Sequence, residues 1–307
     1  MHVVIMGAGA VGGYFGGKLA LASVPVTFLV RENRARQLQQ TGLRVKSLHG
    51  DFEIQPNLAT TPHDIEHPDV VILAMKNYHL DNALPDIRAL AQRGAKILPL
   101  LNGVRHLDTL AQQCGPENVL GGLCYIESTL DSEGAVLQTS PMQDIVFGSL
   151  GSGVTQAWLK ELEQHFVDAK VNVRVSDAIL PDMWRKYIFL VSLSGITSTL
   201  RSPIGVARED EVTMEFLKDM IAEPAAVARA RGVQLPSDLV EQIAAQAMAI
   251  SPAMTSSMHR DLEKGLPLEL DSLQGAVLEM AAEHNLPVPC MRAVYALLHP
   301  FKEGKKA

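Results

Sequence analysis

A glycine-rich turn near the start of the chain limits the available folds more than any other feature. Residues 7–12 read Gly-Ala-Gly-Ala-Val-Gly, directly after the apolar run Val3–Met6 and at the opening of a helical pattern. In that context the first glycine permits a tight turn, the second lets a pyrophosphate approach the backbone, and the third allows close strand–helix packing. The alternative is a purely structural glycine turn. We predict a dinucleotide site whose cofactor-binding residues are Gly7, Ala8, Gly9, Ala10, Val11 and Gly12.

The rest of the first half alternates short β-branched runs with helical patterns, which is typical of a parallel sheet with helices on both faces. Later runs, separated by turns at residues 132–134 and 140–141, are expected to extend this sheet with antiparallel strands. The expected strands are His2–Met6, Val26–Val30, Val70–Met75, Ile97–Leu101, Val119–Ile126, Val136–Thr139, Ile145–Phe147 and Val171–Val175, with a helix at Gln156–Val167.

After Pro181 only helical patterns follow, punctuated by prolines. We expect Pro224 to kink or split the helix that contains it. The fold class is therefore α/β: an N-terminal Rossmann-type doubly wound sheet over residues 1–177, which would bind NADP, followed by an all-helical substrate and catalytic domain over residues 178–307. The expected helices are Met183–Thr199, Val212–Arg231, Ser237–Ala249, Ser256–Lys264, Ser272–His284 and Met291–Leu298.

Composition and charge exclude several classes of function. A net charge of -7 argues against a general nucleic-acid binder, because phosphate neutralisation needs clustered Lys and Arg. Three cysteines without CxxC spacing indicate neither a disulfide framework nor a metal site. Apolar runs are shorter than the roughly 18 residues of a membrane span, and glycines interrupt the N-terminal run, unlike a signal peptide. We expect a cytoplasmic protein with a small-molecule substrate and no membrane or nucleic-acid partner.

The residues that follow the second strand bear on the choice of cofactor. NAD-selective folds place Asp or Glu there for the ribose 2′-hydroxyl, whereas an arginine can grip the 2′-phosphate of NADP. Here Arg31 follows the strand, then Glu32, with Arg34 and Arg36 close by. The pattern favours NADP (NADPH) with Arg31 as a cofactor-binding residue, and Glu32 leaves NAD open.

Polar residues follow two further predicted strands. Lys76 and the pair Asn102-Gly103 come at carboxyl ends of parallel strands, where ligands bind in this fold. We interpret Lys76, Asn102 and also Ile126, at the end of a later strand, as cofactor-binding residues. Structural interpretations stay open: Lys76 as a surface lysine, and Asn102 as the N-cap of a helix beginning at Val104, which is compatible with ligand contact.

Two segments of the helical half are more specific than packing requires. Lys186 lies in Met183–Tyr187, which is expected to open an otherwise apolar helix, and a lysine in the first turn of a core helix is unusual. Glu269 stands in a nearly apolar context after the Thr255–Asp261 segment. Both residues are candidates for chemistry, although Lys186 also suits a salt-bridged helix lysine.

With these residues the sequence resembles the ketopantoate reductase (2-dehydropantoate 2-reductase) family over almost its whole length. The resemblance implies hydride transfer from NADPH to the ketone of a 2-keto acid. The expected substrate is ketopantoate, on the route to pantothenate and coenzyme A. The motifs that carry it, in order, are the GxGxxG turn, Arg31, Lys76, Asn102-Gly103, Trp184-Arg185-Lys186, Ser256–Asp261, Leu268–Gly275 and His284–Met291.

The resemblance also implies roles for individual residues. Lys186 matches the catalytic lysine that hydrogen-bonds the ketone and donates the proton, and an ammonium suits the alkoxide that hydride arrival creates. Glu269 matches a glutamate that orients this lysine and contacts the cofactor or substrate. Asn102, Ser194 and Ser257 match positions that hold the substrate or cofactor.

The sequence departs from the family pattern on the catalytic helix. Leu190 and Ser194 stand one and two turns after Lys186, where the family usually carries asparagines, and Ile204 replaces a further substrate asparagine. Because losing hydrogen-bonding groups alters substrate choice, two alternatives stay open: a paralogous reductase of a different 2-keto acid, and a non-catalytic NADP-binding sensor.

A further alternative is another two-domain dehydrogenase with a helical C-terminal half, such as a hydroxyacyl-CoA or 6-phosphogluconate type. Such an enzyme would be expected to use a catalytic His–Glu pair or a different Lys/Asn constellation. The nearby candidates are His165, His259 and His284, of which His259 is expected to be a helix-surface histidine beside the site. The sequence leaves the oligomeric state open, and the apolar helical domain is compatible with a homodimer.

Overall fold

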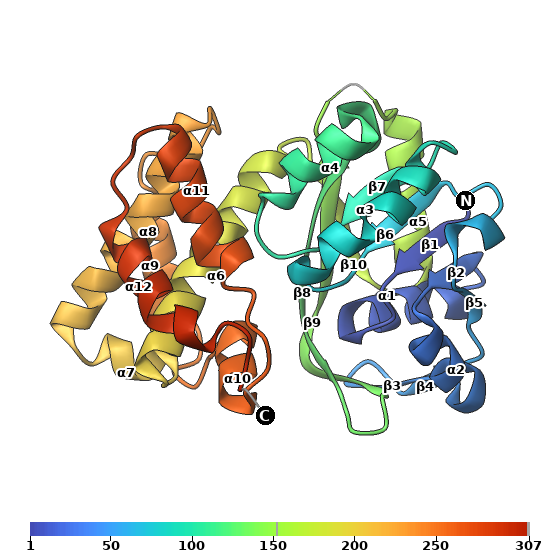
Figure 1. Cartoon of the computed structure of the whole chain (residues 1–307), viewed down its shortest axis with the longest axis horizontal. Helices are drawn as coiled ribbons and strands as arrows, with labels where there is room; N and C mark the ends of the chain where they lie inside the picture. Colours follow the sequence, from blue (N-terminus) through green and yellow to red (C-terminus); the bar gives the residue numbers. More distant parts are fainter. Residues whose placement is uncertain (152, 306–307) are drawn as a thin grey trace. The chain divides into compact units, whose positions relative to one another are not determined.

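The computed structural model describes residues 1–151 and 153–305, and these fold into two compact units. The first unit holds residues 1–101 and 106–179, and the second holds residues 102–105 and the chain from Leu180 onward. Strands and helices alternate in the first unit, whereas the described part of the second is built from helices (Figure 1). The expected fold class, a Rossmann-type sheet followed by a helical domain, is confirmed.

The first sheet is parallel throughout, with strand order β5-β2-β1-β6-β7. Strands β1, β2 and β6 are buried at every position, which explains why their sequences are continuous apolar or β-branched runs. The order reverses direction beside β1, and ligands bind at this switch point in open parallel sheets. The strands are β1 (Val3–Met6), β2 (Val26–Leu29), β5 (Asn57–Ala59), β6 (Val70–Leu73) and β7 (Lys96–Pro99).

A second sheet corrects the expectation that the later strands extend the first. Strand β9 pairs antiparallel with β8 and parallel with β3 and β10, while β3 pairs antiparallel with β4. In the described part of the chain, one parallel bridge, Ile97 to Val119, connects the two sheets. The members of the second sheet are β3 (Leu43–Ser47), β4 (Phe52–Ile54), β8 (Leu120–Leu130), β9 (Val136–Ser149) and β10 (Asn172–Val175).

The prediction of two strands separated by a turn at residues 140–141 is also wrong, because β9 is continuous. The ladder with β8 skips from Gln143 to Gln138 on β9 while β8 advances only from Ile126 to Ser128. Pro141 lies within this irregularity, where a residue without a backbone N–H is tolerated. The proline therefore marks a bulge in a long strand and does not end it.

Helix α1 (Ala10–Leu21) packs between the two sheets of the first unit. A Cβ at Gly16 would lie 2.7 Å from a side chain of β1, and a Cβ at Gly13 would lie 2.9 Å from a side chain of β9. One turn away, Gly12 faces β1 in the same way, and a Cβ at Gly17 would lie 2.8 Å from Phe52 of β4, in the second sheet. The glycines of this helix thus serve close packing on two opposite faces, in addition to the turn that precedes them.

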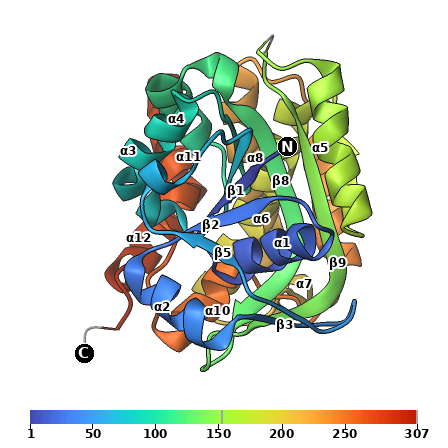
Figure 2. The same ribbon diagram turned by 90° about the vertical axis from the view of Figure 1, so that its right-hand side faces the viewer.

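The other helices of the first unit cover the remaining sheet faces. Helix α5 packs on the second sheet, where Phe166 and Phe147 have ring centroids 6.3 Å apart. Figure 2 shows α5 beside the long strand β9. The helices of this unit are α2 (Glu32–Thr41), α3 (Leu80–Ala91), α4 (His106–Cys114) and α5 (Gln156–Asp168).

The helical unit is organised around α6 (Ile179–Leu200), which begins four residues earlier than expected. Pro181 lies in its first turn, where backbone N–H groups have no intrahelical acceptor and a proline costs little. Helix α8 runs unbroken through Pro224, because buried residues before and after the proline hold it in the core. The other helices are α7 (Ile204–Arg208), α8 (Glu211–Ala230), α9 (Leu239–Ala249), α10 (Ser257–Lys264), the short π-helix η4 (Asp271–Gly275), α11 (Ala276–Glu283) and α12 (Pro289–Leu298).

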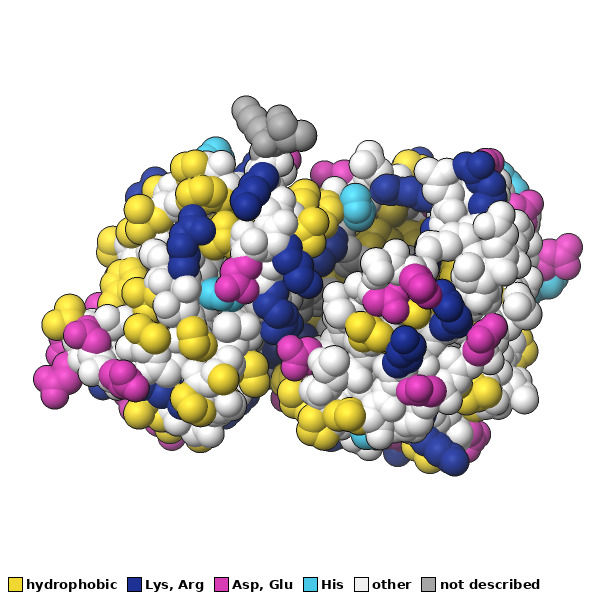
Figure 3. Space-filling model, turned by 90° about the horizontal axis from the view of Figure 1, so that it is seen from below, with side chains coloured by type: hydrophobic (Ala, Val, Ile, Leu, Met, Phe, Trp, Pro, Cys, Tyr) yellow, Lys and Arg dark blue, Asp and Glu magenta, His cyan; other side chains and the backbone are white. Residues whose placement is uncertain are grey.

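Acidic and basic side chains are interspersed on the face of the first unit that Figure 3 shows. Hydrophobic side chains are scattered between them on the same face. Among the residues that the structure describes, there is no helix with both the length and the apolar character needed to cross a bilayer.

Candidate active site

The glycine-rich turn joins β1 to α1, and its three glycines have different surroundings. Gly7 has a φ of +103°, and a Cβ there would lie 2.8 Å from the carbonyl oxygen of Ala74. A Cβ at Gly12 would be 3.0 Å from the side chain of Ile5. A Cβ at Gly9 would meet no described atom within 4 Å. The fold itself requires Gly7 and Gly12, whereas the space above Gly9 is what a ligand approaching the backbone needs.

The start of α1 also suits an anion. Gly9 is the N-cap, and within the described chain no side chain caps this end and no acidic residue lies in the first turn. The first N–H groups of a helix have no intrahelical acceptor, and the positive end of the helix dipole lies there. The turn therefore fits the pyrophosphate of a dinucleotide.

The three arginines after β2 have different hydrogen-bond partners. Arg31, the N-cap of α2, is exposed, and its Nη2 lies 3.4 Å from Nδ1 of His79. Burial, with the positive charge of Arg31, lowers the pKa of His79. Arg36 donates to Asn33 within α2. Arg34 is bonded into the fold and is described below.

Sequence reasoning missed His79. It lies three residues after Lys76, in the short helix Asn77–His79 that follows β6. Because β2 and β6 flank β1 with their carboxyl ends at the same edge, the two strand ends bring Arg31 and His79 together. The position of His79 after a predicted parallel strand was the available signal.

The remaining residues predicted for the cofactor lie in separate places. Lys76 is half-buried and is the N-cap of the short helix after β6. Asn102 is half-buried in the turn after β7, but α4 begins only at His106, so the predicted N-cap role of Asn102 is wrong. Ile126 is half-buried in β8, at the edge of the ladder irregularity.

Lys186 is half-buried in the third turn of α6, and not in the first, because the helix begins at Ile179. The neighbouring Tyr187 is fully buried and donates its hydroxyl to the carbonyl oxygen of Leu273, at 2.6 Å. Burial, with the negative charge of Glu279, raises the pKa of Tyr187 well above its usual range. This tyrosine thus stays a hydrogen-bond donor that ties α6 to the π-helix η4.

Glu269 is 5% exposed and lies just before η4. Ser272 donates its hydroxyl to the carbonyl oxygen of Glu269, and the amide of Gln274 donates to the carbonyl of Val191 at 2.9 Å. A second bond therefore joins η4 to α6, one turn beyond Lys186. Short π-helical segments frequently occur at functional sites.

The turn after β7 contacts the same region. Gly103 has a φ of +84°, and a Cβ there would lie 2.9 Å from the carbonyl oxygen of Ser272 and 3.8 Å from the ring of Tyr187. Three segments that are far apart in the sequence therefore meet within the helical unit. We call this set the Lys186 cluster; its residues are Asn102, Gly103, Lys186, Tyr187, Glu269 and Ser272.

The other residues of α6 and α10 that were predicted to contact the substrate, or that depart from the family pattern, are buried or half-buried. Leu190 is half-buried one turn after Lys186. Ser194 is fully buried and donates its hydroxyl to the carbonyl of Leu190 at 2.6 Å. Ser257 is the first residue of α10, and its neighbour Ser256 caps the helix by accepting from the backbone N–H of His259.

The sequence predicted that His259 lies on the helix surface, and this prediction is wrong. It is 2% exposed, and its Nδ1 lies 2.8 Å from the carbonyl oxygen of Thr197. Its Nε2 lies 3.4 Å from a carboxylate oxygen of Glu263. The ring thus joins α10 to α6. Of the other candidate histidines, His165 is in α5 of the first unit and His284 is exposed after α11.

Comparisons with known proteins cover nearly the whole chain. Residues 3–152 match the family described as ketopantoate reductase PanE/ApbA, and residues 178–303 match its C-terminal domain. An uncharacterized oxidoreductase of Bacillus subtilis, YkpB, is 37% identical over 99% of this chain and 100% of its own length. The 2-dehydropantoate 2-reductase of Pyrococcus abyssi is 27% identical over the full length of both chains.

Solved structures share the fold. A PanE/ApbA family ketopantoate reductase from Ralstonia eutropha matches with a TM-score of 0.87 at 28% identity, over 98% of both chains. D-mandelate dehydrogenase, solved with NADH and anilino(oxo)acetate, matches with a TM-score of 0.87 at 23% identity, over 98% of both chains. A dimeric ketopantoate reductase from Staphylococcus aureus matches with a TM-score of 0.80 at 20% identity, over 98% of this chain and 99% of its own.

Proposed function

The chain belongs to the ketopantoate reductase family and is an oxidoreductase that acts on a CH–OH group with a nicotinamide cofactor, and we propose that it uses NADPH to reduce 2-dehydropantoate (ketopantoate) to pantoate in pantothenate biosynthesis. The observation that carries the proposal is the Lys186 cluster. Its half-buried lysine and buried glutamate lie on segments joined by hydrogen bonds, and the turn that carries Asn102 approaches both segments closely at Gly103. The reaction class needs these groups: a proton donor, an acidic partner and a polar contact for the substrate.

The proposed mechanism gives each group a distinct role. NADPH, when bound, supplies a hydride to C2 of the ketone. Lys186 donates a hydrogen bond to the keto oxygen and transfers a proton to it as negative charge develops there, which yields the 2-hydroxy acid. Glu269 orients the ammonium of Lys186, and Asn102, Ser194 and Ser257 provide polar contacts for the substrate.

The first unit is proposed to hold the cofactor. The amides of the glycine-rich turn bind the pyrophosphate, and the open space at Gly9 supports this assignment. Arg31 is proposed to bind the 2′-phosphate, because its guanidinium is exposed at the carboxyl end of β2. Lys76, Asn102, Ile126 and Glu269 complete the proposed cofactor contacts.

Replacing Lys186 tests the proposal most directly. Lys186→Ala should lower kcat by about 100-fold or more, because proton donation and charge stabilisation are both lost. Binding of NADPH, measured by fluorescence titration, should be retained. Arg185→Ala is the matched control, since Arg185 is the adjacent cation, is exposed, and donates to Gln242 at 2.6 Å. Near-normal turnover by Lys186→Ala would contradict the proposed role.

The cofactor preference has its own test. Wild-type protein should show a much lower KM for NADPH than for NADH. Arg31→Ala should raise the KM for NADPH by about 10-fold or more and change the KM for NADH much less, because only NADPH carries the 2′-phosphate. Arg36→Ala, at an exposed arginine that donates to Asn33, is the control. Equal KM values for the two cofactors in the wild type would contradict the preference.

Leu190 favours a second candidate substrate, a 2-keto acid with an apolar side chain. This residue is half-buried one turn after Lys186 and cannot hydrogen-bond the hydroxyl of ketopantoate. NADPH oxidation should therefore be screened with ketopantoate, with unhydroxylated branched 2-keto acids and with shorter ones. The highest kcat/KM with ketopantoate supports the first candidate, and the highest value with an unhydroxylated acid supports the second. Tight NADPH binding without turnover of any substrate would point to a cofactor-binding sensor.

We further propose that the protein is a homodimer. The dimeric Staphylococcus aureus enzyme of the same fold supports this assignment. Light scattering after size-exclusion chromatography should give twice the chain mass of 33.3 kDa. A mass equal to that of one chain would contradict it.

A further inference from the structure

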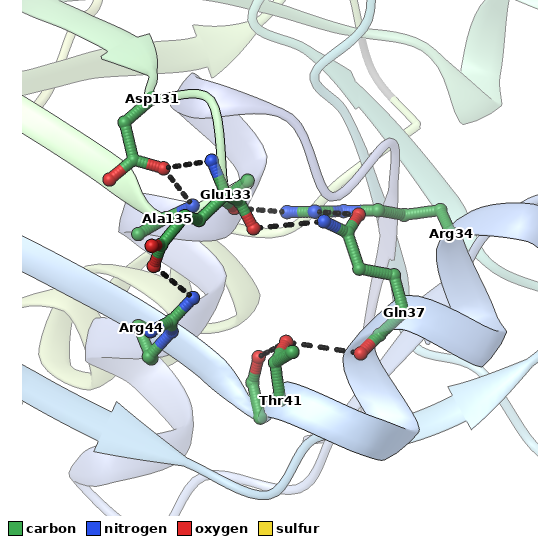
Figure 4. Close-up of polar contacts among 9 residues, drawn as sticks. Arg34, Gln37, Thr41, Arg44, Asp131, Glu133 and Ala135 are labelled. Carbon is green, nitrogen blue, oxygen red and sulfur yellow. Dashed lines mark hydrogen bonds and ion pairs between the residues drawn. The ribbon is translucent and has the colours of Figure 1, made fainter.

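Arg34 connects three separate segments of the first unit. Its Nε donates to the carbonyl oxygen of Ala8 at 3.1 Å, and its Nη2 donates to the carbonyl oxygen of Gly134 at 3.1 Å. Its Nη1 donates to the side chain of Gln37 at 2.7 Å. Figure 4 shows the guanidinium extended from α2 toward the turn between β8 and β9. A planar guanidinium places its donors on three separate nitrogens in a fixed fork, whereas a lysine carries its donors on one nitrogen.

The contact with Ala8 fixes a peptide group of the glycine-rich turn. The hydrogen-bond ladder of α1 begins with Gly9, whose carbonyl accepts from Gly13 at 2.8 Å. The carbonyl of Ala8 lies before that ladder, and Arg34 is its partner. In a planar trans peptide the C=O and the next N–H point in opposite directions. Holding the Ala8 oxygen against α2 therefore directs the Gly9 N–H away from Arg34.

The turn between β8 and β9 has a well-defined conformation of its own. The Asp131 side chain accepts from the backbone N–H groups of Glu133 and Ala135, both at 2.9 Å. The hydrogen bond from Ala135, together with the one from Glu133 and the positive charges of Lys46 and Arg44, holds the pKa of Asp131 below its usual value, although desolvation works against them. The turn thus offers its backbone carbonyls in a fixed arrangement.

Side chains of α2 contact the β8–β9 turn closely. Gln37 donates to the carbonyl of Glu133 at 2.9 Å, next to the Arg34 contact with Gly134. Gly134 has a φ of +82°, and a Cβ there would lie 2.7 Å from Nη1 of Arg34. A side chain at position 134 would therefore displace the ends of the Arg34 and Gln37 side chains from their contacts with this turn. The positive φ of the backbone also favours glycine at this position.

We propose that Arg34 is a positioning residue that ties the glycine-rich turn to the β8–β9 turn, so that the pyrophosphate-binding amides are held ready before the dinucleotide arrives. This inference rests on the proposed role of the glycine-rich turn in dinucleotide binding. It gives the arginines after β2 different roles, because Arg34 orders the protein and Arg31 stays available to the ligand. Preorganisation of this kind raises affinity by removing the cost of ordering the loop at the time of binding.

The test measures dinucleotide affinity directly, by titration of protein fluorescence with NADPH. Arg34→Met should weaken binding by about 10-fold, within the range typical of coupling between sites. At saturating NADPH, kcat should stay within about two-fold of wild type, because Arg34 touches no reacting group. Arg34→Lys should stay weakened, since the two carbonyls are bonded by two different nitrogens of the guanidinium and a lysine has only one.

Gly134→Ala provides a second arm at a residue outside the glycine-rich turn. It should weaken NADPH binding to a similar degree, because it separates the β8–β9 turn from Arg34. Arg44→Met is the matched control. Arg44, in β3, lies 3.2 Å from the carboxylate of Glu133 in the β8–β9 turn, but the arginine that donates to Ala8 in the glycine-rich turn is Arg34. This control should bind NADPH as the wild type does, and thermal unfolding should be recorded for all variants.

The outcomes separate the inference from the proposed function. Wild-type affinity in Arg34→Met or in Gly134→Ala overturns the positioning role and leaves the proposed function intact. Full recovery in Arg34→Lys overturns it as well, since charge alone would then suffice. Equal weakening by Arg44→Met would show a general loss of structure and also overturn it. Absence of NADPH binding by the wild type would overturn both.

Discussion

The glycine-rich turn and the Lys186 cluster are built in opposite ways. The turn is six consecutive residues, and its geometry follows from the absence of side chains at Gly7 and Gly12. The cluster gathers three segments from distant parts of the sequence, and side-chain hydrogen bonds such as that from Tyr187 to Leu273 hold it together. One region is defined by local sterics and the other by a few long-range polar bonds.

This difference determines how each region should fail. Added atoms in the turn collide with backbone that cannot move, so the fold suffers before the chemistry does. A lost hydrogen bond in the cluster leaves most of the packing intact, yet it shifts groups whose positions control the reaction rate. Substitutions should therefore separate the two regions by what they change: unfolding free energy and cofactor affinity in the turn, turnover in the cluster.

The largest effect is expected in the turn, from Gly12→Ala. The new Cβ would overlap the carbonyl oxygen of Gly7 and lie 3.0 Å from Ile5, so we expect a loss of about 3 kcal/mol or more in unfolding free energy. Gly9→Ala is the matched change at a site with a φ of -85° and open space. It should keep stability within about 0.5 kcal/mol of wild type and weaken NADPH binding.

Urea unfolding and NADPH titration together check this pair of glycine variants. If Gly9→Ala destabilises as much as Gly12→Ala, the distinction between a glycine required by the fold and a glycine required by the ligand is wrong. If Gly9→Ala binds NADPH normally, the space above Gly9 does not receive the cofactor.

A smaller effect is expected in the cluster, from Tyr187→Phe. Removing the hydroxyl takes away the side-chain donor of the Leu273 carbonyl, which still accepts from the backbone N–H of Ala276, and loosens η4 against α6. We expect kcat to fall by about 10-fold, because displacement of catalytic groups is costly, while NADPH affinity should fall much less, since Asn102 and Glu269 are only two of the proposed cofactor contacts. Steady-state kinetics and cofactor titration measure the two quantities separately.

Tyr295→Phe is the control for that experiment. Tyr295 donates to Asp271 at 2.8 Å, on the same π-helix, but this bond is exposed. The same chemical change should therefore leave kcat within about two-fold of wild type. Equal losses in the two variants would mean that η4 responds as a whole and that Tyr187 has no particular positioning role.

The sequence is a good guide to the first sheet. The strands around β1, and the turn into α1, follow from local signals: short apolar runs, and glycines whose positions match one geometry. Predicted ends differ from the observed ones by one or two residues for β1, β2 and β6, because fraying ends carry little signal.

The second sheet is much less predictable. Strands β3 and β4 are short and carry no clear local signal, and the sequence pattern divides β9 at Pro141. Their stability comes from pairing between segments far apart in the chain, such as Val45 with Val136, which no local pattern encodes. Tertiary pairing also explains why a proline ends a predicted strand but only makes a bulge in the real one.

The candidate site is predictable in part and for a different reason. Lys186, Glu269 and Asn102 are identified through the ordered motifs of the resemblance, whereas their assembly depends on a bond between Tyr187 and Leu273, 86 residues apart. His259 is expected on a helix surface because a helical pattern alone does not show which neighbour covers it. Its acceptor, the carbonyl of Thr197, belongs to another helix.

The smallest effect concerns the outer side of η4, where Asp271 accepts from Lys302 at 2.7 Å and from Tyr295. Burial alone would raise the pKa of Asp271, but these two partners outweigh it and hold the pKa below its ordinary value. A carboxyl whose pKa is lowered by folding contributes stability above its unfolded pKa of about 3.9, and that contribution is lost as the pH falls through the folded value.

Asp271→Asn should therefore lower the unfolding free energy by about 0.5 kcal/mol at pH 7, a small amount because the ion pair is largely exposed to solvent. The difference from wild type should be constant between about pH 5.5 and pH 8 and should shrink toward zero below about pH 3.5. Urea unfolding across this range measures it, with kcat as a second readout. A turnover loss as large as that of Tyr187→Phe would mean that the exposed side of η4 positions Glu269 as strongly as the buried side. The Lys186 cluster would then depend on an exposed ion pair as well as on a few buried hydrogen bonds, and its contrast with the glycine-rich turn would have to be revised.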